Sequence, residues 1–195
     1  MNKKVLGIVI TVSLIILIIL IVMVSLFLKS PKKEIIKKID GGDISLTYTD
    51  DINGLSLSDL KPISDAAGMK LDSADMFFDF SISTDLMEAN TMDYEISIKK
   101  DNNYSTVLDD NIRVYLEEQK GTNYINVFGP KTYTELEKKS KLGTKKGYMP
   151  ILKVKKTKSD IDNYRLRVWL YDKATIPTGA KQNVTMKVYV NGKAS

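Results

Sequence analysis

The sequence opens with a long apolar segment, residues 5–28, that no charged residue interrupts. About 20 apolar residues in a helix span the hydrocarbon core of a bilayer, so the segment predicts a transmembrane helix. It is longer than the apolar core of a secretory signal peptide, and no A-x-A-like cleavage site follows it before Pro31. We therefore expect a single-pass membrane protein with an uncleaved N-terminal signal-anchor.

Lysines flank the apolar segment on both sides, so the orientation of the chain is not settled by charge alone. Lys3 and Lys4 precede it, and five lysines follow it by residue 38. The positive-inside rule, counted literally, does not favour export of the following domain, although long domains translocate largely regardless of charge. We expect residues 1–28 to form a cytoplasmic stub and the anchor. Residues 29–43 are expected to form a juxtamembrane linker with a short amphipathic turn at 32–39.

The residue types that are missing restrict the chemistry of the remaining 44–195 domain. The sequence has no cysteine and no histidine. Disulfides and thiolate chemistry are therefore excluded, and the commonest general base and metal ligand are absent. We expect one domain that is not an enzyme.

Charge is divided along this domain. Residues 39–118 hold 18 acidic and five basic residues, whereas residues 119–195 hold 17 basic and five acidic residues. Either the two halves interleave in one fold and neutralise each other, or displaced charges steer head-to-tail association between copies. The basic half lacks dense arginine with interleaved aromatic residues, so we do not expect a nucleic-acid partner.

Alternation of apolar and polar residues dominates the sequence from Ile44 onward. Clear runs cover residues 44–49, 78–83, 92–99, 112–117, 164–171 and 183–190, and turn-forming residues such as Asn191-Gly192 follow or separate them. About eight short strands, each with one apolar face, bury those faces by packing as two antiparallel sheets. The pattern therefore predicts an all-β sandwich over 44–195. One helix is expected at 132–141, where Thr132 and Glu135 have the spacing of a capping box.

Two segments have the pattern of a known protein group. Pro62, Ser64, Asp65 and Gly68 precede the strand at 76–82, and the sequence NYRLRVWLYD at 163–172 lies near the C-terminus. With the apolar N-terminal segment, they resemble the TasA/camelysin-like secreted proteins of Gram-positive bacteria. The resemblance implies a jelly-roll-like sandwich on the extracellular face of the membrane. Some members form matrix fibres in which a strand of one copy completes the sheet of the next.

The resemblance does not bring an enzymatic activity with it, and a second analogy concerns the fold alone. Camelysin is described as a metalloprotease, but this chain has no histidine and therefore no H-E-x-x-H motif. The spacing of Asp160, Tyr164 and Leu166 is similar to that of the tyrosine corner of immunoglobulin-like sandwiches. The expected subtype is accordingly jelly-roll or immunoglobulin-like.

Three groups of residues are candidate sites. Loop oxygens suited to calcium come from Asp50, Asp51, Asn53, Asp109 and Asp110, without EF-hand spacing. No other cofactor is expected. A strand face suited to a carbohydrate or protein partner, or to burial on both sides, comes from Arg165, Arg167, Trp169 and Tyr171. A basic loop, either solvated or facing phosphate-rich wall polymer or anionic lipid, comes from Lys138, Lys139, Lys141, Lys145 and Lys146.

These features together predict a membrane-anchored cell-surface protein with a structural, adhesive or matrix-assembly role. The alternative is a non-catalytic binding or accessory subunit of a membrane-associated secretion, pilus or transport machine. The expected partners are the lipid bilayer and either another copy of the chain or a different surface protein.

Overall fold

The computed structural model of the protein describes residues 15–18, 32–49, 53–143, 145–176 and 179–195. The chain divides into two compact units, Met1–Pro31 and Lys32–Ser195. Residues 15–18 are helical, and the rest of the predicted anchor lies outside the described residues. Within the described part, no helix is long and apolar enough to cross a membrane. The anchor therefore stays a prediction.

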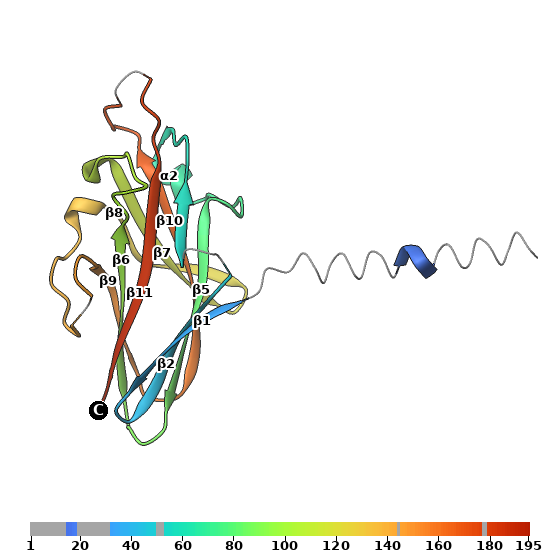
Figure 1. The fold of residues 1–195 in the computed structure, drawn as a ribbon, viewed down its shortest axis with the longest axis vertical. Coiled ribbons are helices and arrows are strands. Elements are labelled where there is room, and N and C mark those ends of the chain that lie inside the picture. The colour runs from blue at the N-terminus through green and yellow to red at the C-terminus, as the bar shows by residue number, and fades with distance from the viewer. Residues whose placement is uncertain (1–14, 19–31, 50–52, 144, 177–178) are drawn as a thin grey trace, which may run out of the picture. The chain divides into compact units, whose positions relative to one another are not determined.

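The second unit is a β-sandwich of two sheets whose neighbouring strands are almost all antiparallel (Figure 1). Among the described residues, the larger sheet has the order β1 (Lys33–Ile39), β2 (Gly42–Tyr48), β5 (Phe77–Leu86), β10 (Asp160–Tyr171), β7 (Ile112–Lys120) and β8 (Asn123–Thr132). The short β4 (Pro62–Ile63) pairs in parallel with the end of β10. The smaller sheet has the order β3 (Gly54–Leu57), β11 (Val184–Ala194), β6 (Met92–Lys100) and β9 (Met149–Lys156). The predicted all-β sandwich is confirmed.

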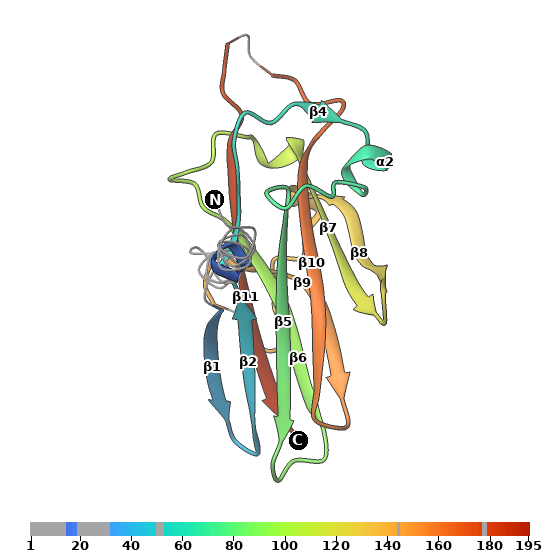
Figure 2. The same cartoon turned by 90° about the vertical axis from the view of Figure 1, so that its right-hand side faces the viewer.

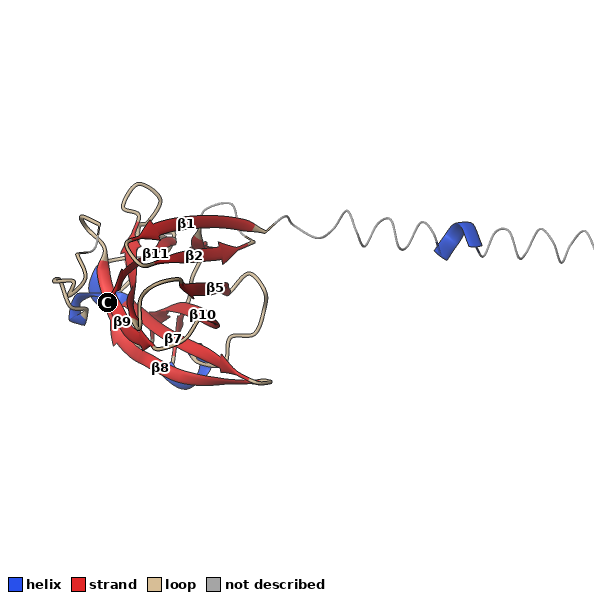
Figure 3. Cartoon of the chain, turned by 90° about the horizontal axis from the view of Figure 1, so that it is seen from below, coloured by secondary structure: helices blue, strands red, loops and turns tan. Residues whose placement is uncertain are grey.

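Figure 3 shows the two sheets lying face to face. The core lies between them, because alternate side chains of each strand are buried there. Ile82 and Leu166 from the larger sheet and Ile96 from the smaller sheet are completely buried. On the inner face of the larger sheet, the ring of Phe80 stacks on that of Tyr164 at a centroid distance of 5.6 Å. The two sheets thereby bury one contiguous core, as the alternation of the sequence predicts.

The acidic and basic halves of the domain interleave in this fold. Two strands of the basic half lie beside strands of the acidic half: β10 lies between β5 and β7, and β11 lies beside β6. Ion pairs join the two halves, among them Arg165–Asp79 at 2.7 Å and Lys187–Asp101 at 2.8 Å. The neutralising interpretation of the charge division is therefore confirmed for these pairs, and steered association between copies stays a prediction.

Two local predictions were wrong. The turn expected at 32–39 is instead β1, which pairs along its whole length with β2; Gly41, at φ +84°, lies in the tight reversal between them. The helix expected at 132–141 is a single 3₁₀ turn, Tyr133–Glu135. Thr132 and Glu135 do form the capping box, but Leu136 returns to extended backbone because its side chain packs into the core.

Candidate functional site

The predicted stripe on β10 lies on the outer face of the larger sheet, and a chain segment containing α2 (Asp65–Gly68) covers part of it (Figure 2). Trp169 is 1% exposed, and a Cβ added to Gly68 would lie 2.2 Å from the indole Cδ2. The indole Nε1 also donates a hydrogen bond of 3.2 Å to Asp65 Oδ1. Of the two alternatives predicted for this stripe, a partner face and burial on both sides, Trp169 shows the second, because β10 is buried on both faces at this point.

Arg167 is also buried and fastens the covering segment to the sheet. Its Nε donates a hydrogen bond of 2.6 Å to the Leu71 carbonyl, and its guanidinium pairs with Glu117. Burial lowers the pKa of Arg167. Tyr171, at the end of the stripe, carries the guanidinium of Arg113 over its ring at 3.9 Å. Arg167 is therefore buried and bound within the chain, which is the predicted alternative of burial on both sides.

Arg165 is the member of the stripe that lies beside an open part of the face. Its guanidinium lies over the rings of Phe77 at 3.6 Å and Tyr124 at 4.3 Å. Two hydrogen bonds of 2.7 Å join it to the carboxylate of Asp79, which raises the pKa of Arg165. These contacts fix the ring of Tyr124 on the outer face of the sheet.

A pocket of about 360 Å³ opens next to Arg165, and we call it the outer-face pocket. Part of its lining is a row of polar side chains in register across three strands, formed by Thr47, Ser81 and Asn163. The Ser81 hydroxyl donates a hydrogen bond of 2.7 Å to Asn163 Oδ1. The remaining lining comes from Lys32, Tyr48, Thr49, Asp79, Phe80, Gln119, Tyr124 and Tyr164.

The chemistry of this pocket is that of neutral polar groups beside an aromatic ring and a carboxylate. Burial raises the pKa of Tyr124, so its hydroxyl is uncharged at neutral pH. Within the described part of the chain, the hydroxyls of Thr47 and Tyr124 have no protein hydrogen-bond partner. Hydroxyl and amide groups both donate and accept hydrogen bonds, so the pocket suits a ligand rich in hydroxyl groups.

The predicted basic residues lie exposed in the segment 136–148 before β9, which we call the lysine loop. Its backbone is fixed to the smaller sheet by Glu95 and Asn191, which are cross-strand partners. The Glu95 carboxylate accepts hydrogen bonds from the Ser140 hydroxyl and, at 3.1 Å, from the Lys141 N–H. Asn191 Nδ2 donates a hydrogen bond of 2.9 Å to the Gly143 carbonyl. The loop is therefore held by hydrogen bonds to two nearly buried side chains.

The structure does not gather the calcium candidates into a site. Asp50 and Asp51 lie outside the described residues. The amide of Asn53 donates a hydrogen bond of 2.9 Å to the Val188 carbonyl, and Asp109 pairs with Lys100. Among the described residues, no group of three or more acidic side chains is arranged to hold a metal ion. Calcium binding at these residues stays an untested prediction.

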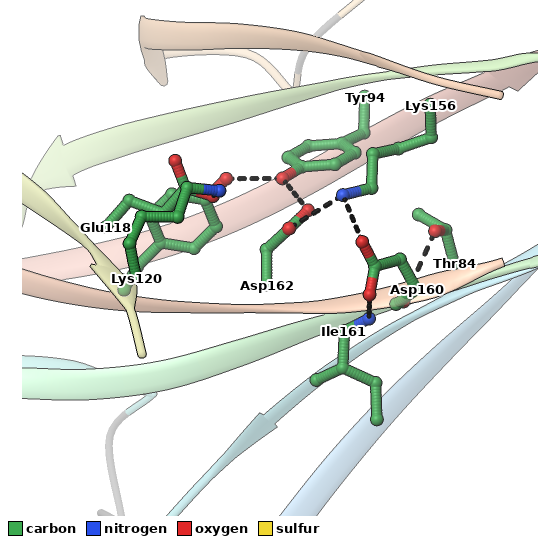
Figure 4. Close-up of polar contacts among 9 residues, drawn as sticks. Thr84, Tyr94, Glu118, Lys120, Lys156, Asp160, Ile161 and Asp162 are labelled. Carbon is green, nitrogen blue, oxygen red and sulfur yellow. Dashed lines mark hydrogen bonds and ion pairs between the residues drawn. The ribbon is translucent and has the colours of Figure 1, made fainter. Parts of the chain in front are cut away.

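A buried polar cluster, which the sequence did not predict, joins the two sheets near the start of β10 (Figure 4). Lys156 Nζ contacts Asp162 Oδ1 at 2.7 Å and Asp160 Oδ2 at 3.0 Å. The Tyr94 hydroxyl donates a hydrogen bond of 2.6 Å to Asp162 Oδ2 and also contacts the Tyr164 hydroxyl. The Asp162 side chain is only 5% exposed, so the cluster connects β6, β9 and β10 inside the sandwich.

The ionisation of this cluster fits a structural role. Burial raises the pKa of both Tyr94 and Tyr164, which keeps their hydroxyls protonated. Burial alone would lower the pKa of Lys156, but its hydrogen bonds to Asp162 and Asp160 outweigh this and raise it. The ammonium also lowers the pKa of Asp160. A charged lysine held by carboxylates is neither a free nucleophile nor a base.

The residues of the outer-face pocket were not singled out from the sequence, because they come from several strands that are distant in the sequence. The alternation did place Thr47 and Ser81 on polar strand faces. Only the register, which aligns Thr47 with Ser81 and Ser81 with Asn163, brings them together. The one local signal was Asn163, beside the acidic pair Asp160 and Asp162.

Comparisons with known proteins identify no family. No family model matches the chain, and no curated protein matches it. Among solved structures, the chain is similar to AvmM, which catalyses macrocyclization in alchivemycin A biosynthesis. The two sequences are 9% identical, the match covers 83% of this chain and 96% of that chain, and the TM-score is 0.23. It is also similar at 6% identity to the collagen-binding domain of the Erysipelothrix rhusiopathiae surface protein RspB, covering 85% and 60% of the two chains, with a TM-score of 0.18. Scores this low carry no argument about function.

Proposed function

We propose that this chain is a non-enzymatic surface protein whose sandwich binds saccharide through the outer-face pocket. The observation that carries the proposal is the lining of that pocket. Its volume of about 360 Å³ lies within the usual range of ligand pockets, and its polar groups come from several strands of a rigid sheet.

Saccharide fits this lining because a sugar combines many hydroxyl groups with apolar ring faces. The Thr47 hydroxyl can donate to or accept from a sugar hydroxyl, the Ser81 hydroxyl can still accept, and the Asn163 amide nitrogen can donate. The ring of Tyr124, held by Arg165, offers an aromatic surface for an apolar sugar face. The carboxylate of Asp79, whose side chain is 45% exposed, adds a charge-assisted acceptor.

The cellular setting of the proposal comes from the sequence. The apolar segment 5–28 would anchor the chain in the membrane, and the resemblance to TasA/camelysin-like proteins supports a sandwich outside a Gram-positive cell as part of this proposal. A surface domain that holds wall or matrix saccharide would serve the structural or adhesive role expected from the sequence. The jelly-roll or immunoglobulin-like subtype and association between copies belong to the same proposal.

The proposal is tested by calorimetric titration of the full chain in detergent with chitotetraose and cellotetraose. We expect one of the two to bind, and Tyr124→Ala to weaken binding by about tenfold, the loss expected for one well-packed aromatic contact. Asn163→Ala removes an amide from the row of polar side chains and should also weaken binding. The matched control is Tyr104→Ala, because Tyr104 is 68% exposed and is not among the residues that line the pocket.

Two results would contradict the proposal. The first is that neither saccharide binds the unmodified chain. The second is that Tyr124→Ala and Tyr104→Ala lose the same affinity. The second result would mean that binding does not involve the outer-face pocket.

A further inference from the structure

The lysine loop and the strand that follows it form one lysine-rich segment without acidic residues. Residues 138–158 include nine lysines and no aspartate or glutamate. Lys153 and Lys156 form ion pairs, with Asp93 and with Asp160 and Asp162. The other seven are exposed, and no ion pair within the described part of the chain involves them: Lys138, Lys139, Lys141, Lys145, Lys146, Lys155 and Lys158. We call these seven residues the lysine strip.

The fold makes this strip continuous across the loop and the edge of the smaller sheet. β9 is the last strand of that sheet, and Lys153 and Lys155 pair with Glu95 and Asp93 of β6. Glu95 also holds the loop at Lys141, so the loop lies beside Lys153. Lys141 and Lys153 line a common pocket together with Lys131 and the acidic side chains of Glu95, Glu135 and Glu137.

The backbone of the lysine loop is held by hydrogen bonds, and this distinguishes the lysine strip from a freely solvated charged segment. Glu95 and Asn191 are 2% and 4% exposed, and both use their side chains to hold backbone or side-chain groups of residues 140–143. A charged loop that is already ordered loses less conformational entropy when it binds. The lysines next to these contacts are thereby held along one edge of the sandwich.

We propose that the lysine strip binds an extended phosphate polymer. Lysine is a flexible point charge, which suits repeated phosphate groups without fixed geometry, and the segment 138–158 contains no arginine for bidentate recognition. Lys155 extends this strip onto the edge strand β9, and Lys158 follows directly after that strand.

The residues of this segment argue against two other negatively charged partners, a lipid bilayer and a nucleic acid. None of the exposed large apolar side chains of the described part lies within 138–158, so the strip has no group to insert into a lipid bilayer. The aromatic residue of the segment, Tyr148, packs at a tilt of 50° against the ring of Tyr189, with the ring centroids 5.3 Å apart, so its ring is already engaged and does not offer a free face to a nucleic-acid base.

The test measures binding of labelled inorganic polyphosphate to the full chain in phosphatidylcholine nanodiscs. The affinity is followed between about 50 and 200 mM salt, because each phosphate contact adds about 0.7 to the slope of log affinity against log salt for a flexible single strand. The variant replaces Lys138, Lys139, Lys145 and Lys146 by glutamine. The matched control replaces four exposed lysines elsewhere, Lys61, Lys70, Lys173 and Lys181, by glutamine, so that the net charge changes equally.

We expect the strip variant to reduce the salt slope by about 3 and the control to leave it almost unchanged. Equal losses in the two variants would mean that net charge alone drives binding, and this would overturn the proposal. Absence of polyphosphate binding at the lowest salt would overturn it as well. The strip would be a membrane contact instead if the variant lost binding to phosphatidylglycerol vesicles and kept its binding to polyphosphate.

Discussion

Replacing Lys156 by methionine should strongly destabilise the sandwich, because it leaves a buried carboxylate without its counter-ion. The Asp162 side chain is 5% exposed, and Lys156 at 2.7 Å is its only cationic partner among the described residues. Removing one member of a buried ion pair costs about 3–5 kcal/mol. The hydrogen bond from Tyr94 remains, but a neutral hydroxyl does not balance the charge.

Removing the other member of the pair should cost less. In Asp162→Leu, Lys156 keeps its 3.0 Å contact with Asp160, whose side chain is 42% exposed, and its long stem can bring the ammonium toward water. We expect a loss of about 1–3 kcal/mol for this variant. The double variant Lys156→Met, Asp162→Leu removes both charges, and we expect it to lie within about 1 kcal/mol of the unmodified domain.

The assay is denaturant unfolding of the unit Lys32–Ser195, followed by the fluorescence of Trp169, the single tryptophan of the chain. The double-mutant cycle should give a coupling free energy of at least about 2 kcal/mol between the two positions. The reasoning would be refuted if Lys156→Met cost under about 1 kcal/mol, or if the two single losses added up to the loss of the double variant.

Three further predictions concern pH, packing and the lysine loop. The pKa of Tyr94 and Tyr164 is raised in the folded state, so their contribution to stability is complete below about pH 10 and declines as the pH rises above it. Denaturant unfolding at increasing pH measures this decline, and a free energy of unfolding that stays constant from about pH 9 to about pH 11 would contradict the prediction. Gly68→Ala should cost about 1–3 kcal/mol and shift the Trp169 emission to longer wavelength, because its Cβ would overlap the indole, and unchanged emission would contradict the packing. Glu95→Ala should accelerate amide hydrogen exchange in the lysine loop by removing the hydrogen bonds that hold it, whereas equal exchange in both proteins would mean that the loop is fixed by other contacts.

The fold class could be predicted because alternation depends only on neighbouring residues. Tyr164, Leu166 and Val168 alternate with polar residues in the sequence, and all three are buried in the core. Turn predictions from short sequence motifs were wrong where pairing with a distant strand decides the local structure. Asn191-Gly192 has the composition of a tight turn, yet both residues lie within β11 because they pair with Glu95 and Tyr94.

The candidate sites could be predicted only in part, because their environment comes from segments distant in the sequence. Trp169 belongs to a typical binding stripe, but the covering segment reaches it from about 100 residues away and removes it from the surface. The lysines of the basic loop are exposed as expected. Their fixing by Glu95 depends on a carboxylate that is more than 40 residues earlier in the chain.

The most direct test of the proposed binding face is chemical-shift mapping by NMR. Isotope-labelled Lys32–Ser195 is titrated with the tetrasaccharide that binds in calorimetry. The account predicts that the largest changes fall on Thr47, Ser81, Asn163, Gln119 and Tyr124, which line the outer-face pocket. Changes confined to the smaller sheet or the lysine loop, with these five residues unaffected, would contradict it.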